Sequence, residues 1–168
     1  MTDLFRFPNP VNEYAARTVA GGVLALSGLT LVLSAVLDSA WLWLTVPLAA
    51  GFLARVATGP TLSPLGQLAT RVIAPRLGAA RPVPGPPKRF AQGVGAVFSL
   101  AAAVAYLGFG SAPAAIAFVA LIAVAATLES VFAYCIGCKV FAGLMRIGLI
   151  PAEVCLECAD VSARWQRA

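Results

Sequence analysis

The stretch TVAGGVLALSGLTLVLSAVL, residues 18–37, contains no charged side chain. At 1.5 Å per residue, a helix of this length crosses the ~30 Å hydrocarbon core of a bilayer. The rest of the chain has the same character, because 60% of its 168 residues are hydrophobic and only 11% are charged. Soluble domains average about 45–50% apolar and about 25% charged residues. The sequence therefore predicts an all-α integral membrane protein.

Three further apolar segments predict three more spans, at about residues 40–57, 91–109 and 112–134. The second is the least regular, because Pro47 interrupts it. Short turns join the first span to the second and the third to the fourth, so the four spans are expected to form two hairpins. The N-terminal residues lack the features of a cleaved signal peptide, so the first span is expected to be retained. Residues 1–168 are expected to form a single membrane domain.

Positive charge gathers between the second and third predicted spans, with no Asp or Glu among them: Arg55, Arg71, Arg76, Arg81, Lys88 and Arg89. The two turns at the opposite end carry no positive charge. The positive-inside rule then places this segment and both termini in the cytoplasm. We expect a multi-pass protein of the inner (plasma) membrane, with the lipid bilayer as its first partner. The net charge of +5 reflects this topology and does not indicate nucleic-acid binding.

Two segments outside the spans have amphipathic helical patterns, at about residues 64–77 and 139–150. Such patterns are typical of helices that lie along a membrane interface. The proline-rich residues 81–89, RPVPGPPKR, predict a stiff linker. Residues 151–168 are expected to form a cysteine-containing cytoplasmic tail. The fold is thus two hairpins, each followed by an amphipathic cytoplasmic helix.

With no histidine in the chain, cysteine provides the candidate chemistry, and histidine-dependent catalysis is excluded. The four cysteines form two Cys-x-x-Cys pairs, Cys135 with Cys138 and Cys155 with Cys158. Their spacing lies within the range of a four-thiolate zinc site, and an iron–sulfur cluster also uses four thiolates. Each pair could instead cycle between dithiol and disulfide, which in the cytosol is usually transient and catalytic. A third alternative is that some are small buried hydrophobic residues.

The charges near each pair bear on this choice. The first pair is expected where the fourth span ends, and the negative end of a helix dipole disfavours a thiolate there. Lys139 acts in the opposite direction. The second pair is followed or flanked by Glu153, Glu157 and Asp160, which also disfavour a thiolate. These surroundings favour a metal site or a slow relay slightly over a fast nucleophile.

Two charged residues fall within or beside predicted spans, Arg55 at the end of the second and Glu129 in the fourth. An unpaired charge in hydrocarbon costs about 2.5–3.5 kcal/mol on insertion scales. We therefore predict that Arg55 and Glu129 pair, directly or through water, and join the two hairpins. The alternatives are that Glu129 accepts a proton during thiol chemistry, or that it is exposed at the membrane interface.

Three motifs carry a resemblance to a known family: LSPLGQLATRVIAPRL at 62–77, KRFAQGVGAVF at 88–98 and FAYCIGC at 132–138. With them the chain resembles the domain-of-unknown-function 4395 family of small multi-span bacterial membrane proteins, over roughly residues 9–143. The resemblance implies association with thioredoxin-like and rhodanese-like sulfur proteins, which favours thiol or sulfur handling. Asn or a small residue is usual in this family at position 129, so the resemblance implies no catalytic role for Glu129. Cys155 and Cys158 lie outside the resemblance.

Two functions are therefore carried forward. The first is an accessory in thiol or sulfur redox handling, with Cys135 and Cys138 as the working pair and Cys155 and Cys158 relaying to a soluble partner. The second is a non-enzymatic scaffold whose four cysteines hold zinc and dock a cytosolic protein. The chain is also similar to vitamin K epoxide reductase-type enzymes, but their dithiol faces the oxidising compartment. A transporter is disfavoured, because the spans carry one internal charge and no polar stripe.

Overall fold

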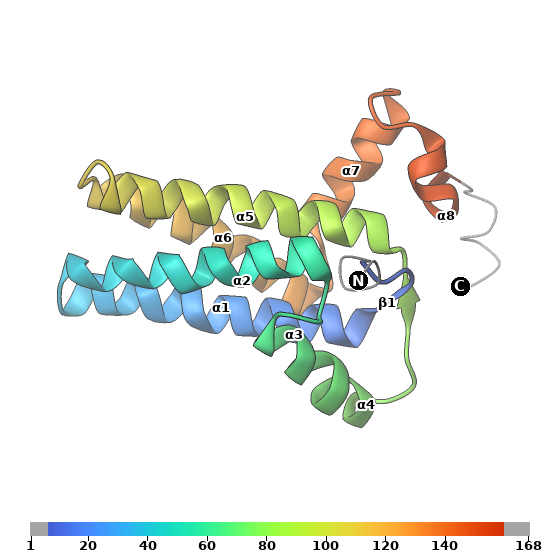
Figure 1. Cartoon of the computed structure of the whole chain (residues 1–168), viewed down its shortest axis with the longest axis horizontal. Helices are drawn as coiled ribbons and strands as arrows, with labels where there is room; N and C mark the ends of the chain where they lie inside the picture. Colours follow the sequence, from blue (N-terminus) through green and yellow to red (C-terminus); the bar gives the residue numbers. More distant parts are fainter. Residues whose placement is uncertain (1–6, 160–168) are drawn as a thin grey trace.

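The computed structural model describes residues 7–159, and it is dominated by four long helical segments that run side by side (Figure 1). These segments are α1 (Glu13–Val36), the 3-10 helix η2 (Ser39–Leu44) followed by α2 (Thr45–Thr58), α5 (Gly85–Leu107) and α6 (Ala112–Phe132). Each segment is long and apolar enough to cross a bilayer. This confirms the predicted all-α membrane fold with four spans.

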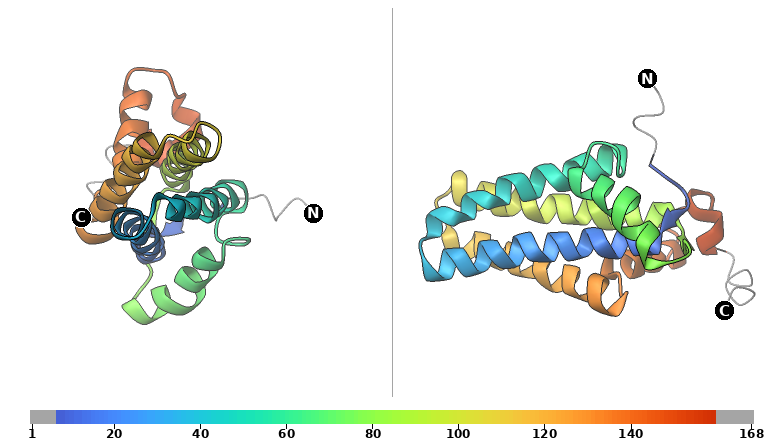
Figure 2. Two further views of the ribbon diagram at one scale, coloured as in Figure 1. Left: turned by 90° about the vertical axis from the view of Figure 1, so that its left-hand side faces the viewer. Right: turned by 90° about the horizontal axis from the view of Figure 1, so that it is seen from below.

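The spans are connected as two hairpins, but their closest packing is between hairpins. Helix α1 packs mainly on α6, and α2 packs mainly on α5. The view along the bundle in Figure 2 shows the four helices gathered around one axis. Because α5 is the main packing partner of α2, side chains at the end of α2 contact α5 rather than α6.

The interior of the bundle is built largely from small side chains, many of them alanine. The buried hydroxyls of Ser27, Thr30 and Ser99 each donate a hydrogen bond of 2.8 Å to the carbonyl oxygen four residues earlier in the same helix. Small and internally satisfied residues let membrane helices approach closely. Large apolar side chains such as Val97 and Val124 are exposed on the outer surface, where lipid would cover them.

The third span begins earlier than the sequence indicated. The predicted linker at 81–89 supplies β2 (Pro82–Val83), which pairs with β1 (Val11–Asn12) in an antiparallel ladder, and then the first turn of α5 from Gly85. Prolines occupy the first positions of α5, where a helix needs no backbone N–H donor. Lys88 therefore lies in a helix and not in a flexible linker.

The remaining helices lie at the end of the bundle opposite the two hairpin turns. Residues 64–77 are helical throughout, as α3 (Pro64–Leu68), the π-helix η3 (Ala69–Ile73) and α4 (Ala74–Leu77). The second amphipathic helix, α7 (Ile136–Arg146), starts and ends earlier than the predicted 139–150, and η4 (Ala152–Cys155) and α8 (Leu156–Ala159) follow it. Helices α3–α4 and α7 project from opposite sides of the bundle (Figure 2). Residues 160–168 of the predicted tail lie outside the described residues.

Candidate functional site

The chain reverses direction between α6 and α7 at Ala133. Its backbone is left-handed, with φ 55° and ψ 21°, a conformation common just past the end of a helix. Arg17 of α1 supports this end, because its Nη2 donates to the carbonyl oxygens of Ser130 at 3.0 Å and Val131 at 3.2 Å. These are carbonyls that the end of a helix leaves without intrahelical partners. The turn places Cys135 directly before α7.

Cys135 is the N-cap residue of α7, and Cys138 lies in the first turn of the same helix. The expectation that this pair lies at the negative end of the fourth span was wrong, because α6 ends at Phe132 and a new helix begins. The thiols therefore face the positive end of the α7 dipole, which favours a thiolate. Both are free thiols; Cys135 is buried and Cys138 is half-buried.

The pKa values of the two thiols are shifted in opposite directions. Hydrogen bonding from Cys138 lowers the pKa of Cys135 below its ordinary value, and the charge of Lys88 acts in the same direction against burial and Glu129. The pKa of Cys138 is raised, first because its thiol is held by that hydrogen bond and then because it is buried. Cys135 is thus the thiol better suited to attack, and Cys138 is the one that keeps its proton.

An ion pair lies beside these thiols, but it is not the pair predicted from the sequence. Lys88 Nζ lies 2.6 Å from Glu129 Oε1, and both side chains are about 15% exposed. The predicted pairing of Arg55 with Glu129 was wrong. Arg55 Nε donates to Gln92 Oε1 at 2.8 Å, and its Nη1 donates to Ser63 Oγ at 3.4 Å. The reason is that α5 packs against both α2 and α6. Helix α5 supplies Gln92 as a partner for Arg55 and Lys88 as a partner for Glu129.

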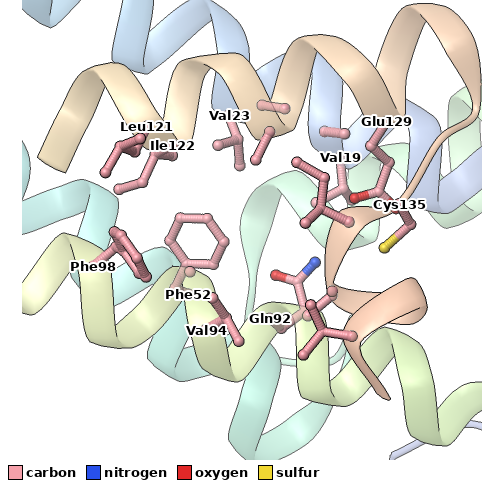
Figure 3. Close-up of a pocket in the computed structure, with 18 residues that line it drawn as sticks. Val19, Val23, Phe52, Gln92, Val94, Phe98, Leu121, Ile122, Glu129 and Cys135 are labelled. Carbon is pink, nitrogen blue, oxygen red and sulfur yellow. The ribbon is translucent and has the colours of Figure 1, made fainter. Parts of the chain in front are cut away.

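Cys135 contributes to a mainly apolar cavity of about 350 Å³ that is lined by side chains of all four spans and α7. Figure 3 shows Gln92, Glu129 and Cys135 together at one end of this cavity, and Phe98, Leu121 and Ile122 at the other. The buried thiol therefore stands where the apolar interior of the bundle meets its few polar groups.

A second cavity, of about 290 Å³, also adjoins the thiol pair. Cys135 and Cys138 both line it, together with Lys88 and Cys158. Cys158 is joined to Cys155 in a disulfide. The structure thus brings a free dithiol and one sulfur of a disulfide to the wall of a single cavity.

The four cysteines do not form a metal-ligand cluster. Among residues 7–159, no group of three or more Cys, Asp, Glu or His side chains is arranged to hold a metal ion. Two of the four sulfurs are bonded to each other, which removes them as thiolate ligands. The predicted four-cysteine zinc or iron–sulfur site is therefore not formed in this arrangement.

Sequence reasoning overlooked Lys88, Gln92 and Gly137. Lys88 and Gln92 are four residues apart and therefore lie on the same face of α5. The proline-rich residues 81–89 were predicted to be a linker, so Lys88 was not placed in a helix with Gln92. Prolines at the first positions of a helix are a recognised start pattern that could have revealed it. At Gly137, an added Cβ would lie 2.6 Å from Ala91 Cβ, so glycine permits the close contact of α7 with α5. That contact holds the thiols beside Lys88.

Comparison with curated proteins and with solved structures finds no match for this chain. A family model described as a domain of unknown function (DUF4395) matches residues 11–146. The matched region contains all four spans and the pair Cys135 and Cys138, and it excludes Cys155 and Cys158. The chain therefore belongs to the domain-of-unknown-function 4395 family.

Proposed function

We propose that this protein is a membrane-bound thiol redox protein that passes electrons between its two Cys-x-x-Cys pairs. The observation that carries the proposal is the shared cavity, whose wall includes both thiols of the first pair and Cys158 of the disulfide. The position of Cys135 at the start of α7 supports its role as the attacking thiolate. Reduced Cys135 and Cys138 would be the electron donors, and the disulfide would be the acceptor.

The exchange proceeds in two balanced steps. The Cys135 thiolate attacks the sulfur of Cys158, so that a Cys135–Cys158 bond forms and Cys155 leaves as a thiolate. Cys138 then gives up its proton and attacks the sulfur of Cys135, which releases Cys158. The first pair ends as a disulfide and the second as a dithiol, so two electrons move and the released proton is taken up by a leaving thiolate.

A soluble partner with its own disulfide would accept the two electrons from the second pair, and a dithiol reductant acting on the Cys135–Cys138 disulfide would then return the first pair to its reduced state. Exchange with a thioredoxin-like protein returns Cys155 and Cys158 to the disulfide and leaves the partner as a dithiol. The positive charge at this end of the bundle supports a cytoplasmic location for that partner. The family resemblance supports the same class of partner, and it also admits a rhodanese-like protein that carries sulfur as a persulfide.

The test is to trap the mixed disulfide between the two pairs. In Cys138→Ser the resolving thiol is missing, so a Cys135–Cys158 bond should accumulate and be identified by mass spectrometry of peptides prepared without reductant. The matched control, Cys135→Ser, removes the attacking thiol and should show no such bond. An intact Cys155–Cys158 disulfide in Cys138→Ser, with Cys135 still free, would refute the proposal.

Metal analysis tests the competing function on the same preparations. One zinc per reduced chain, lost in each of the four single Cys→Ser variants, would identify a structural metal site and overturn the redox proposal. We expect no stoichiometric zinc, because the described cysteines are not clustered as ligands.

A further inference from the structure

Arg55 is buried without a negative partner among the described residues. Its side chain is 5% exposed, although it lies on a predicted membrane span. Its contacts are neutral: the amide oxygen of Gln92, the hydroxyl of Ser63, and the ring of Phe52, whose centroid lies 4.7 Å from the guanidinium carbon. Glu129, the carboxylate expected to balance it, is paired with Lys88 instead. Arg55 therefore retains a full, uncompensated charge.

One guanidinium nitrogen of Arg55 also lacks a hydrogen-bond acceptor. Nη2 is buried and has no partner among residues 7–159. Native proteins rarely leave a buried donor without a hydrogen bond, and the loss of folding free energy is largest when the donor is charged. A buried cation with a free donor therefore points to an acceptor that is not part of the described chain.

A cavity of about 290 Å³ adjoins Arg55, and its largely apolar wall carries a few polar and cationic side chains. Its polar wall is formed by Arg55, Lys88, Gln92, Asn12 and Thr70, and none of the described acidic side chains lines it. Lys88 is neutralised by Glu129, which lies outside the lining, so Arg55 supplies the excess positive charge. Arginine suits such a role, because its planar guanidinium matches the oxygens of phosphate and carboxylate groups.

We infer that this cavity binds a phosphate-like oxyanion beside the Arg55 guanidinium. The site differs from the thiol site and does not depend on the proposed redox function, since none of the cysteines lines it. The residues that line it belong to the N-terminal segment, α1, α2, α3, η3 and α5 and to the turn after α2. Helices α3 and α4 lie at this end of the bundle (Figure 1). The oxyanion could be free phosphate or sulfate, or the headgroup of an anionic phospholipid.

The first experiment uses inorganic phosphate and sulfate as probes. The full-length protein in neutral detergent is titrated with each anion at constant ionic strength, with chloride as the replaced salt, and the thermal unfolding midpoint is recorded. We expect a saturable rise with phosphate or sulfate and none with chloride. Arg55→Gln should abolish the rise, and Arg55→Lys should weaken binding by about tenfold, because lysine keeps the charge but loses the planar donors. The control Arg71→Gln removes an exposed cation and should behave like the wild-type protein.

The second experiment separates the two sources. Native mass spectrometry compares binding of phosphatidylglycerol and phosphatidylcholine to wild type and Arg55→Gln. Arg55-dependent binding of phosphatidylglycerol that phosphate displaces identifies a lipid headgroup, and saturation by phosphate alone identifies a free anion; either result supports the site. The proposal is overturned if neither anion binds saturably, or if Arg55→Gln binds as tightly as wild type.

Discussion

The ion pair between Lys88 and Glu129 gives the sharpest energetic prediction. The two atoms lie 2.6 Å apart and both side chains are about 15% exposed, so neither charge has much access to water. We consider Glu129→Gln, Lys88→Met and the double variant. Each single change leaves one buried charge without its partner, whereas the double change removes both.

The magnitude follows from that geometry. At an effective dielectric constant of about 20, unit charges 2.6 Å apart attract by about 6 kcal/mol, most of which is offset by the desolvation of both groups. Removing one partner of a buried pair costs about 3–5 kcal/mol, because the other charge is left uncompensated. We therefore expect each single variant to lose about 3 kcal/mol of unfolding free energy. The double variant should lose about 1 kcal/mol, less than either single variant, because it leaves no charge unpaired.

The assay is a double-mutant cycle on the unfolding free energy in mixed micelles, titrated with a denaturing detergent. A second cycle with Arg55→Gln and Glu129→Gln is the matched control. It should be additive within about 0.5 kcal/mol, since Arg55 contacts Gln92 and Ser63 and not Glu129. If the Lys88 cycle were additive, the pair would contribute nothing and the explanation would fail. Strong coupling in the Arg55 cycle would instead restore the pairing predicted from the sequence.

Three further predictions concern the thiols, their support and the topology. The rate of Cys135 alkylation should rise with pH around a midpoint below that of an ordinary thiol, because the pKa of Cys135 is lowered, and Lys88→Met should move the midpoint upward because it removes a charge that stabilises the thiolate. A midpoint unchanged in Lys88→Met would contradict this electrostatic account. Gly137→Ala should cost about 1–3 kcal/mol, measured by thermal unfolding, because the new methyl group overlaps Ala91 in the α5–α7 contact. A cysteine placed at position 38 in a background without other cysteines should react with an impermeant maleimide from outside the cell, and reaction only after lysis would invert the topology.

The four spans could be predicted from the sequence because a membrane helix needs only local information. Residues 18–37 are uncharged and long enough to cross the bilayer whatever their neighbours are, and the structure places α1 over most of them. The amphipathic stretch 64–77 was equally local, since its periodicity reflects a single helix. The two Cys-x-x-Cys pairs were also recognisable, because spacing along the chain defines them.

The partners of the charges and thiols depended on how the helices pack, which the sequence alone did not determine. Glu129 had two cations within reach, and the choice of Lys88 over Arg55 follows from α5 standing beside both α2 and α6. The pKa of Cys135 depended on whether α6 continued or ended before Ala133. Because α6 ends there, Cys135 lies at the positive N-terminal end of α7. Composition and periodicity thus determined which segments enter the membrane, because burial in lipid depends on each segment by itself. Which side chains meet depended on tertiary structure, because contacts between distant residues arise only when whole helices settle against one another.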